Sequence, residues 1–130
     1  MVYKRILIID DDEDDQRFIA EAVEVITHSA VVTVFDNAVE AIKKLAARQI
    51  IADLIFLDLN MPLMHGNDFL REIRKAPTLR DIPIVILTGV TNTIITEAAM
   101  NAGATDVILK PSSVHELVEV LQPFLSPVPH

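Results

Sequence analysis

Five short runs of aliphatic residues recur along the chain, and stretches with helix-like spacing of apolar residues lie between them. The runs cover residues 6–9, 31–35, 54–57, 84–87 and 107–109. Continuous runs rich in Ile, Val and Leu are typical of strands that are buried on both faces. Five repeats of a strand followed by a helix predict a parallel sheet covered by helices on both faces, which is an α/β doubly wound domain.

The stretches between the runs predict five helices. They cover approximately residues 14–26, 37–48, 67–75, 93–102 and 113–121. Asn37 followed by Glu40 indicates a helix start, and Gly103 indicates a helix end. We expect Pro123 to end the last helix, because proline lacks the backbone N–H that a further helical turn needs.

Length and composition restrict the chain to one compact domain. Its 130 residues are 51% hydrophobic, which suffices for one core. No apolar run approaches the roughly 20 residues of a bilayer span, and no signal peptide precedes the first strand. We therefore expect a cytoplasmic protein, with a domain at residues 1–125 and a short Pro-rich tail at residues 126–130. The absence of cysteine excludes disulfides, thiolate metal sites and a cysteine nucleophile.

The net charge of −8 argues against binding of a nucleic-acid backbone, which requires a basic face. The acidity is concentrated in residues 10–15, all of which are Asp or Glu. The last four of these residues fit the acidic first turn of a helix. Asp10 and Asp11 do not, because they follow directly after a predicted buried strand. These two carboxylates therefore need a chemical explanation.

A calcium-binding loop is an alternative interpretation of the acidic run. Its ligand positions would fall on Asp10, Asp12, Asp14 and Glu21. Such a loop requires glycine where this chain has Asp15, and it follows a helix rather than a strand. The sequence disfavours this alternative.

Polar residues follow all five predicted strands, and those after the second, Asp36 and Asn37, indicate only a helix cap. Asp10 and Asp11 follow the first, Asp58 the third, Thr88 the fourth and Lys110 the fifth. In open α/β sheets ligands bind beyond the carboxyl ends of the strands, and the strand order 2-1-3-4-5 makes the first and third strands neighbours. We therefore expect the three aspartates to converge, with the threonine and the lysine on the far side.

Three carboxylates in one pocket raise one another's pKa values unless a cation neutralises them. Oxygen ligands with open coordination positions suit Mg²⁺, which is usually bound through one or two carboxylates and a phosphate. A lysine and a hydroxyl beside such a metal can hold the oxygens of a transferring phosphoryl group. These residue types indicate a phosphoryl-transfer site whose nucleophile is a carboxylate.

The chain resembles the response-regulator receiver domain over nearly its whole length. The matching segments are residues 6–12, 57–66, 85–89, 103–104 and 110–111. The resemblance implies a flavodoxin-like fold and a stand-alone phospho-accepting switch of a two-component phosphorelay. Asp58 would accept a phosphoryl group from a sensor histidine kinase or a histidine phosphotransfer protein, and Thr88 and Lys110 would bind the phosphoryl oxygens. Such a protein assists its own phosphorylation and dephosphorylation, and its output is a contact with another protein.

The resemblance also implies a set of metal ligands. Asp11 would bind Mg²⁺ directly and Asp10 through water, together with Asp58. The backbone carbonyl of Asn60 would complete the metal shell.

One departure from the family pattern concerns the response to phosphorylation. Val107 stands where the family usually places a Tyr or Phe that swings inward on activation, whereas Gly89 fits the family's need for a small residue after the threonine. A degenerate receiver that acts as a non-phosphorylated interaction module is the main alternative. Such a domain normally loses one of the acidic residues or the lysine, and this chain retains them all.

Two further classes fit less well. A flavin-binding flavodoxin would need a phosphate loop where residues 10–15 would repel the phosphate. A haloacid-dehalogenase-type phosphatase would carry its nucleophile on the first strand, with a second aspartate two residues later. Here the candidate is Asp58 on the third strand, and Asn60 follows it.

Two apolar stripes run along the first predicted helix, at residues 18, 22 and 25 and at residues 19, 23 and 26. One stripe is enough to face a core. The second stripe, which includes Ile19, either contacts the helices of the phosphodonor or widens the buried face. The sequence leaves both interpretations open. His65 is interpreted as an ordinary loop residue.

Overall fold

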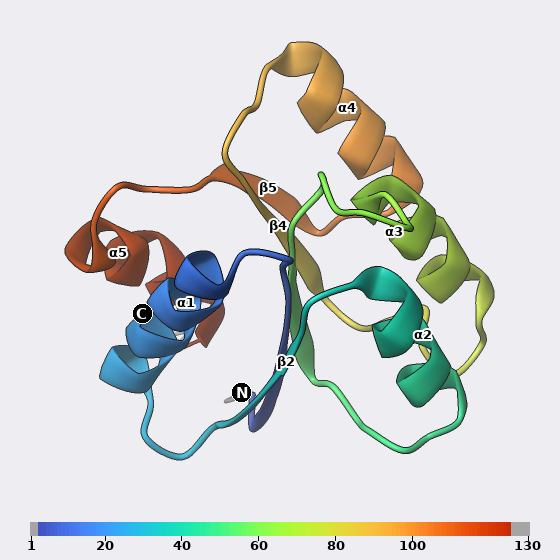
Figure 1. Cartoon of the computed structure of the whole chain (residues 1–130), viewed down its shortest axis with the longest axis horizontal. Helices are drawn as coiled ribbons and strands as arrows, with labels where there is room; N and C mark the ends of the chain where they lie inside the picture. The colour runs from blue at the N-terminus through green and yellow to red at the C-terminus, as the bar shows by residue number, and fades with distance from the viewer. Residues whose placement is uncertain (1–2, 126–130) are drawn as a thin grey trace.

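A computed structural model describes residues 3–125, and in this part of the chain five parallel strands form one sheet between two layers of helices (Figure 1). The strands are β1 (Arg5–Ile9), β2 (Val31–Phe35), β3 (Leu54–Leu57), β4 (Ile84–Thr88) and β5 (Asp106–Leu109). The helices are α1 (Glu13–Ile26), α2 (Ala38–Ala46), α3 (Gly66–Lys75), α4 (Thr93–Ala102) and α5 (Val114–Leu125). The strand order β2-β1-β3-β4-β5 confirms the predicted α/β doubly wound topology.

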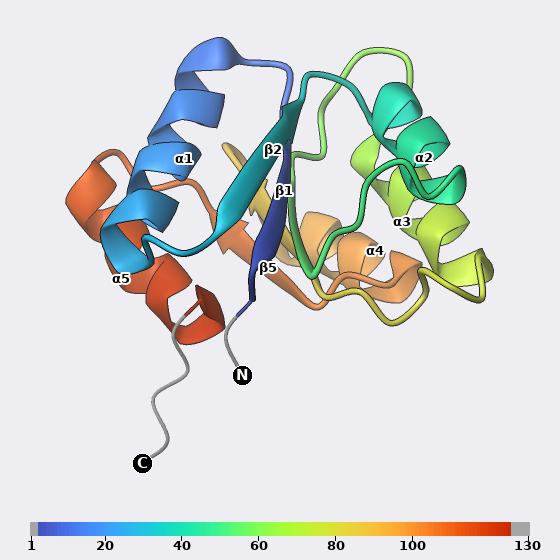
Figure 2. The same ribbon diagram turned by 90° about the horizontal axis from the view of Figure 1, so that it is seen from below.

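The helices cover both faces of the sheet, with α1 and α5 on one face and α2, α3 and α4 on the other (Figures 1 and 2). The side chains of β1 alternate between the two faces of the sheet, so this one strand contributes to both parts of the core. Leu7 and Ile9 belong to the core under α2, α3 and α4. Ile6 and Ile8 belong to the core under α1 and α5. A run without polar residues is therefore required at the centre of the sheet.

The expectation that every strand is buried on both faces is wrong for the two edge strands. The residues of β1, β3 and β4 are buried almost throughout, whereas Val31 of β2 and Leu109 of β5 are exposed. Each edge strand has a neighbour on one side only, so part of its side-chain surface stays in contact with solvent.

Helix α5 continues past Pro123, where we expected it to end. Leu117, Leu121 and Leu125 lie four residues apart on one face of this helix, and all three are buried in the core under α1 and α5. A proline in a helix costs about 3 kcal/mol, and full burial of a leucine contributes about 1.5–3 kcal/mol. Burial of Leu125 therefore offsets most of the cost of the helical turn around the proline.

The apolar stripe of α1 that includes Ile19 is not left over for a partner. Ile19 is 3% exposed and Val23 is buried, so the stripe that we considered for docking faces the core. Val25, assigned to the other stripe, is 60% exposed. The buried face of α1 is centred on Ile19, Ala22 and Val23. The docking hypothesis is wrong for this stripe, and the wide buried face is the correct interpretation.

Within residues 3–125, none of the helices combines the length and the apolar character needed to cross a membrane. The Pro-rich tail expected at residues 126–130 lies outside the described residues.

Candidate functional site

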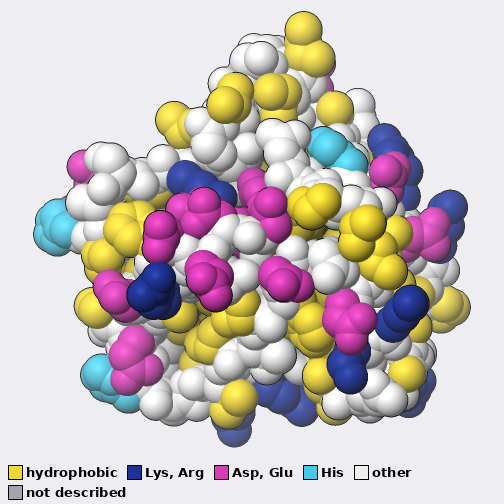
Figure 3. All heavy atoms as spheres, viewed as in Figure 1, with side chains coloured by type: hydrophobic (Ala, Val, Ile, Leu, Met, Phe, Trp, Pro, Cys, Tyr) yellow, Lys and Arg dark blue, Asp and Glu magenta, His cyan; other side chains and the backbone are white. Residues whose placement is uncertain are grey.

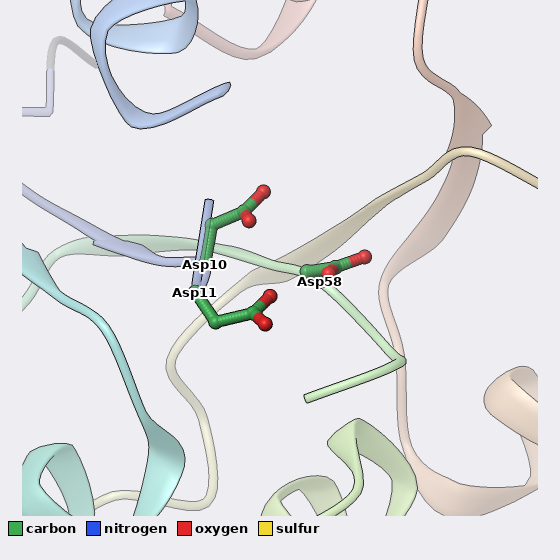
Figure 4. A group of neighbouring side chains, drawn as sticks. All are labelled: Asp10, Asp11 and Asp58. Atoms are coloured by element: carbon green, nitrogen blue, oxygen red, sulfur yellow. The ribbon is translucent and has the colours of Figure 1, made fainter. Parts of the chain in front are cut away.

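Three carboxylates meet at the carboxyl ends of β1 and β3. Residue Ile9 of β1 pairs with Leu57 of β3, so the residues that follow, Asp10 and Asp58, leave neighbouring strands at the same level. The backbone N–H of Asp58 donates to the Ile9 carbonyl over 2.9 Å. Asp10, Asp11 and Asp58 each offer a carboxylate oxygen within 4.8 Å of the others. Figure 4 shows the side chains of Asp10 and Asp11 extending toward the side of the sheet on which Asp58 lies.

Two of these carboxylates are removed from solvent. Asp10 is 1% exposed and Asp58 is 9% exposed, whereas Asp11 is open to solvent. Burial raises the pKa of Asp58 to about 6, and the neighbouring charges of Asp10 and Asp11 add to this effect. Burial also raises the pKa of Asp10. The pocket therefore favours any positive charge that can neutralise these groups.

Lys110 supplies one such charge from the end of β5. Its Nζ lies 2.7 Å from Asp10 Oδ2 and 2.8 Å from Asp15 Oδ2, and 3.7 Å from Asp58 Oδ1. Burial alone would lower the pKa of Lys110, but its hydrogen bonds to Asp10 and Asp15 and the nearby charge of Asp58 raise that pKa above its usual value. The ammonium group is therefore charged at neutral pH.

Thr88 is the last residue of β4 and is buried beside the lysine. The backbone N–H of Lys110 donates to the Thr88 carbonyl over 2.8 Å, which fixes the two strand ends to each other. The Thr88 hydroxyl donates to the Val90 carbonyl over 3.1 Å. In this structure the hydroxyl thus binds its own loop, and it must leave the Val90 carbonyl before it can donate to a phosphoryl oxygen.

The loop after Asp58 turns back sharply into α3. Asn60 is exposed on this loop. The backbone N–H of Gly66, the first residue of α3, donates to the Leu59 carbonyl over 2.8 Å. His65, interpreted above as an ordinary loop residue, is the N-cap of α3, because its Nδ1 accepts from the backbone N–H of Asn67 over 3.0 Å. The start of α3 is therefore fixed directly behind the candidate phospho-acceptor.

The rest of the acidic run begins α1, as its composition predicted. Asp12 is the N-cap, and its Oδ1 accepts from the backbone N–H groups of Asp14 and Asp15 over 2.8 and 3.1 Å. The Asp14 carboxylate lies 3.0 Å from Arg17. Glu21 lies within the helix rather than in a loop. The calcium-loop alternative is wrong, because three of its four ligand positions, Asp12, Asp14 and Glu21, belong to one helix and its cap.

Asp15 is the site residue that the sequence analysis missed, since it was assigned only to the helix start. It is the third residue of α1, and side chains at this position reach back toward the residues that precede a helix. Here the residues that precede the helix follow β1. The position of an acid three residues after the N-cap was the signal that could have identified it.

The set of donors suits a hard divalent cation. The three converging carboxylates offer only oxygen ligands, and Asp11 keeps the group open to solvent on one side. Mg²⁺ and related ions prefer such ligands and retain several waters. Figure 3 shows acidic side chains gathered in the middle of this face of the molecule. Residues 11–14 are all exposed at the start of α1 and belong to this acidic surface.

Comparison with known proteins gives one consistent family. Residues 6–122 match the family model described as the response regulator receiver domain. The cyclic di-GMP phosphodiesterase response regulator RpfG of Xanthomonas campestris is 35% identical over 112 residues, which are 86% of this chain and 29% of that protein. The chain thus spans less than a third of the length of this relative.

Two solved structures are similar to the whole fold. The phosphorylated cyanobacterial phytochrome response regulator RcpA has a TM-score of 0.86 and 28% sequence identity, with 98% of each chain covered. The Mn²⁺-bound form of response regulator Rcp1 has a TM-score of 0.85 and 26% identity, with 97% of each chain covered. One of these relatives is therefore described as phosphorylated and the other as metal-bound.

Proposed function

Because this chain belongs to the response-regulator receiver domain family of two-component signalling, we propose that it is a phospho-accepting switch whose acceptor is Asp58. The observation that carries the proposal is the surroundings of this carboxylate. It lies at a strand end beside Asp10 and Asp11, within 4.8 Å between ligand atoms, and 3.7 Å from the ammonium of Lys110. A phosphoryl group on Asp58 would therefore be met by the ammonium of Lys110 on one side and by any cation that Asp10 and Asp11 hold on the other.

In the proposed reaction an oxygen of the Asp58 carboxylate attacks the phosphorus of a phosphohistidine in line with the N–P bond. A new O–P bond forms, the N–P bond breaks, and the electron pair leaves with the imidazole of the donor. The nucleophile must be ionised, and a pKa of about 6 leaves most of Asp58 ionised at neutral pH. Lys110 would balance the charge of the phosphoryl oxygens, and Thr88 would donate its hydroxyl to one of them.

Mg²⁺ is the proposed cofactor, held by Asp11 and Asp58, by Asp10 through water, and by the Asn60 carbonyl. When bound, it would neutralise charge on the carboxylates and on the phosphoryl oxygens. The oxygen-only donor set supports this assignment. A similar receiver is described as binding Mn²⁺, which has similar ligand preferences.

The proposed phosphodonor is a sensor histidine kinase or a histidine phosphotransfer protein of the cytoplasm. The exposed acids at residues 11–14 beside the site support a donor that has a basic surface around its phosphohistidine. The same acids disfavour nucleic acid as the output partner, so we propose that the output is a contact with another protein. A degenerate receiver without phosphorylation is disfavoured, because the acids, the acceptor and the lysine are all retained.

Incubation with acetyl phosphate and Mg²⁺, followed by intact-mass analysis, tests the proposal. The wild-type protein should gain the mass of one phosphoryl group, and Asp58→Asn should gain none. Asp106→Asn is the matched control, because Asp106 begins β5 at the opposite end of the sheet. This control should be phosphorylated like the wild type. Full phosphorylation of Asp58→Asn would show that the acceptor is another residue.

A further inference from the structure

Lys110 divides its hydrogen bonds between two carboxylates, and only one of them belongs to the three-aspartate group. The second is Asp15, whose Oδ2 lies 2.8 Å from Nζ. We propose that Asp15 is a positioning residue that holds Lys110 on the α1 side of the site, short of Asp58. This inference rests on the proposed function, because it concerns the lysine that would bind the phosphoryl group.

The distances define the resting position of the ammonium. An ammonium group has three N–H donors, and Lys110 directs hydrogen bonds to Asp10 over 2.7 Å and to Asp15 over 2.8 Å. Its distance of 3.7 Å from Asp58 Oδ1 permits an ion pair but exceeds hydrogen-bond length. While Asp15 holds Lys110, the ammonium group therefore interacts with Asp58 electrostatically and without a hydrogen bond.

Asp15 is held firmly enough to act as an anchor. Its backbone N–H donates to the Asp12 cap over 3.1 Å. The adjacent residue, Gln16, donates from Nε2 to the Asp10 carbonyl over 2.6 Å and so ties the first turn of α1 to the end of β1. The backbone that carries the Asp15 side chain is thus fixed at the helix start, whereas the ammonium of Lys110 lies at the end of a longer and more flexible side chain.

Asp15 also stands apart from the proposed metal ligands, because it does not belong to the group of three converging carboxylates. A cation bound by that group would repel the ammonium of Lys110 and would share the charge of Asp10. Asp15 would remain as the one hydrogen-bonded carboxylate that the lysine does not share with the metal. The hydrogen bond to Asp15 would then be the main interaction that opposes movement of Lys110 toward Asp58.

Phosphorylation would reverse this balance. A phosphoryl group on Asp58 adds negative charge and strong acceptor oxygens, and movement of Lys110 Nζ toward them would weaken its hydrogen bond to Asp15. The resting state is therefore favoured by Asp15 and the phosphorylated state is opposed by it. Neutralising Asp15 should make the phosphorylated arrangement easier to reach, rather than harder.

Beryllofluoride, which mimics the phosphoryl group, provides the test in the presence of Mg²⁺. For Asp15→Asn we expect a dissociation constant about three- to tenfold lower than that of the wild type, given the usual strength of a charged, partly exposed hydrogen bond. Asp14→Asn is the matched control, since it removes the same charge from the same turn but its carboxylate pairs with Arg17. The control should bind beryllofluoride like the wild type.

Two further measurements separate positioning from a general effect on folding or charge. In the Lys110→Met background, Asp15→Asn should no longer change beryllofluoride affinity. A crystal structure of unphosphorylated Asp15→Asn should show Nζ of Lys110 within hydrogen-bond distance of Asp58 instead of 3.7 Å away.

The inference is overturned if Asp15→Asn binds beryllofluoride no more tightly than Asp14→Asn, or if Nζ stays in place in its crystal structure. Failure of the wild type to bind beryllofluoride would instead count against the proposed function. In that case the position of Nζ in the variant still decides the role of Asp15.

Discussion

Gly66 and Asp58 approach each other so closely that a β-carbon on Gly66 would lie 2.8 Å from the backbone oxygen of Asp58. The same β-carbon would lie 2.9 Å from Cα of Leu59. These neighbours are backbone atoms that belong to the loop carrying the candidate acceptor, so they cannot yield without moving Asp58 itself. The first turn of α3 thus packs rigidly against the loop that carries the candidate acceptor.

Gly66→Ala should therefore destabilise the protein by about 1–3 kcal/mol, as expected for a forced contact in a packed region. It should also slow phosphorylation by acetyl phosphate, because the displaced backbone carries the acceptor. Gly89→Ala is the matched control, since a β-carbon there meets nothing within 4 Å. Chemical denaturation and intact-mass time courses of both variants measure the two effects. Equal stability of the two variants would show that the loop yields freely.

The raised pKa of Asp58 predicts how stability depends on pH when no metal is bound. Between its ordinary value of 3.8 and about 6, the folded protein keeps a proton on Asp58 that the unfolded chain has released. The free energy of unfolding therefore falls as the pH rises through this window, and it stays at the lower value above it.

Asp58→Asn removes this titration. When the pH is raised from about 4 to about 7, the free energy of unfolding of the variant should increase by about 1–3 kcal/mol relative to that of the wild type. Urea denaturation of both proteins at the two pH values, with a chelator present, measures the difference. A difference that is constant with pH would contradict the raised pKa. Added Mg²⁺ should reduce the difference, because the cation stabilises the ionised carboxylate.

Asp11 and Asp12 are adjacent acids for which the structure predicts opposite consequences. Asp11 belongs to the converging carboxylates, whereas the Asp12 carboxylate accepts from the first backbone N–H groups of α1. Asp11→Ala should lose most Mg²⁺ affinity and little stability. Asp12→Ala should lose about 1 kcal/mol of stability, as is usual for a removed N-cap, and should keep Mg²⁺ binding. Isothermal titration and denaturation distinguish the two variants, and equal losses of affinity would invalidate this assignment.

The response to phosphorylation should be concentrated in the loop after β4. Thr88 must release the Val90 carbonyl to reach a phosphoryl group, and this pulls on the exposed loop that contains Gly89. Val107, paired with Ile86 and packed against the core, is a β-branched residue with few rotamers to exchange. Amide shifts on adding beryllofluoride should therefore be largest at residues 88–95. A rotamer change at Val107 with an unmoved loop would place the switch in β5 instead.

The sheet and its polar strand ends could be predicted from the sequence because both depend on local patterns. Runs such as residues 54–57 indicate central strands without reference to their neighbours, and parallel connectivity then places Asp10 and Asp58 at the same edge. The pairing of Ile9 with Leu57 is the register that this reasoning requires. Residues whose position depends on tertiary packing were harder to predict. Pro123 continues α5 because Leu125 is buried.

Two further residues were wrongly interpreted from the sequence for the same reason, because their roles depend on tertiary contacts. The stripe with Ile19 was considered for a partner because the sequence does not show how wide the buried face of α1 is. Asp15 was assigned to its helix alone, although its hydrogen bond to Lys110 spans 95 residues. A contact of that separation leaves no periodic signal in the sequence.

The bond between Asp10 and Lys110 joins residues that are 100 positions apart, and it sets an order of events during synthesis. The acids that follow β1 are made first, and the lysine that balances them is made only after β5. A chain that lacks β5 has Asp10 without its counter-charge, so repulsion among the aspartates opposes closure of that end of the sheet. Non-local contacts of this kind slow folding, because a long loop must close before they form. Under the proposed function, chains that end before Lys110 should therefore fail to accept a phosphoryl group.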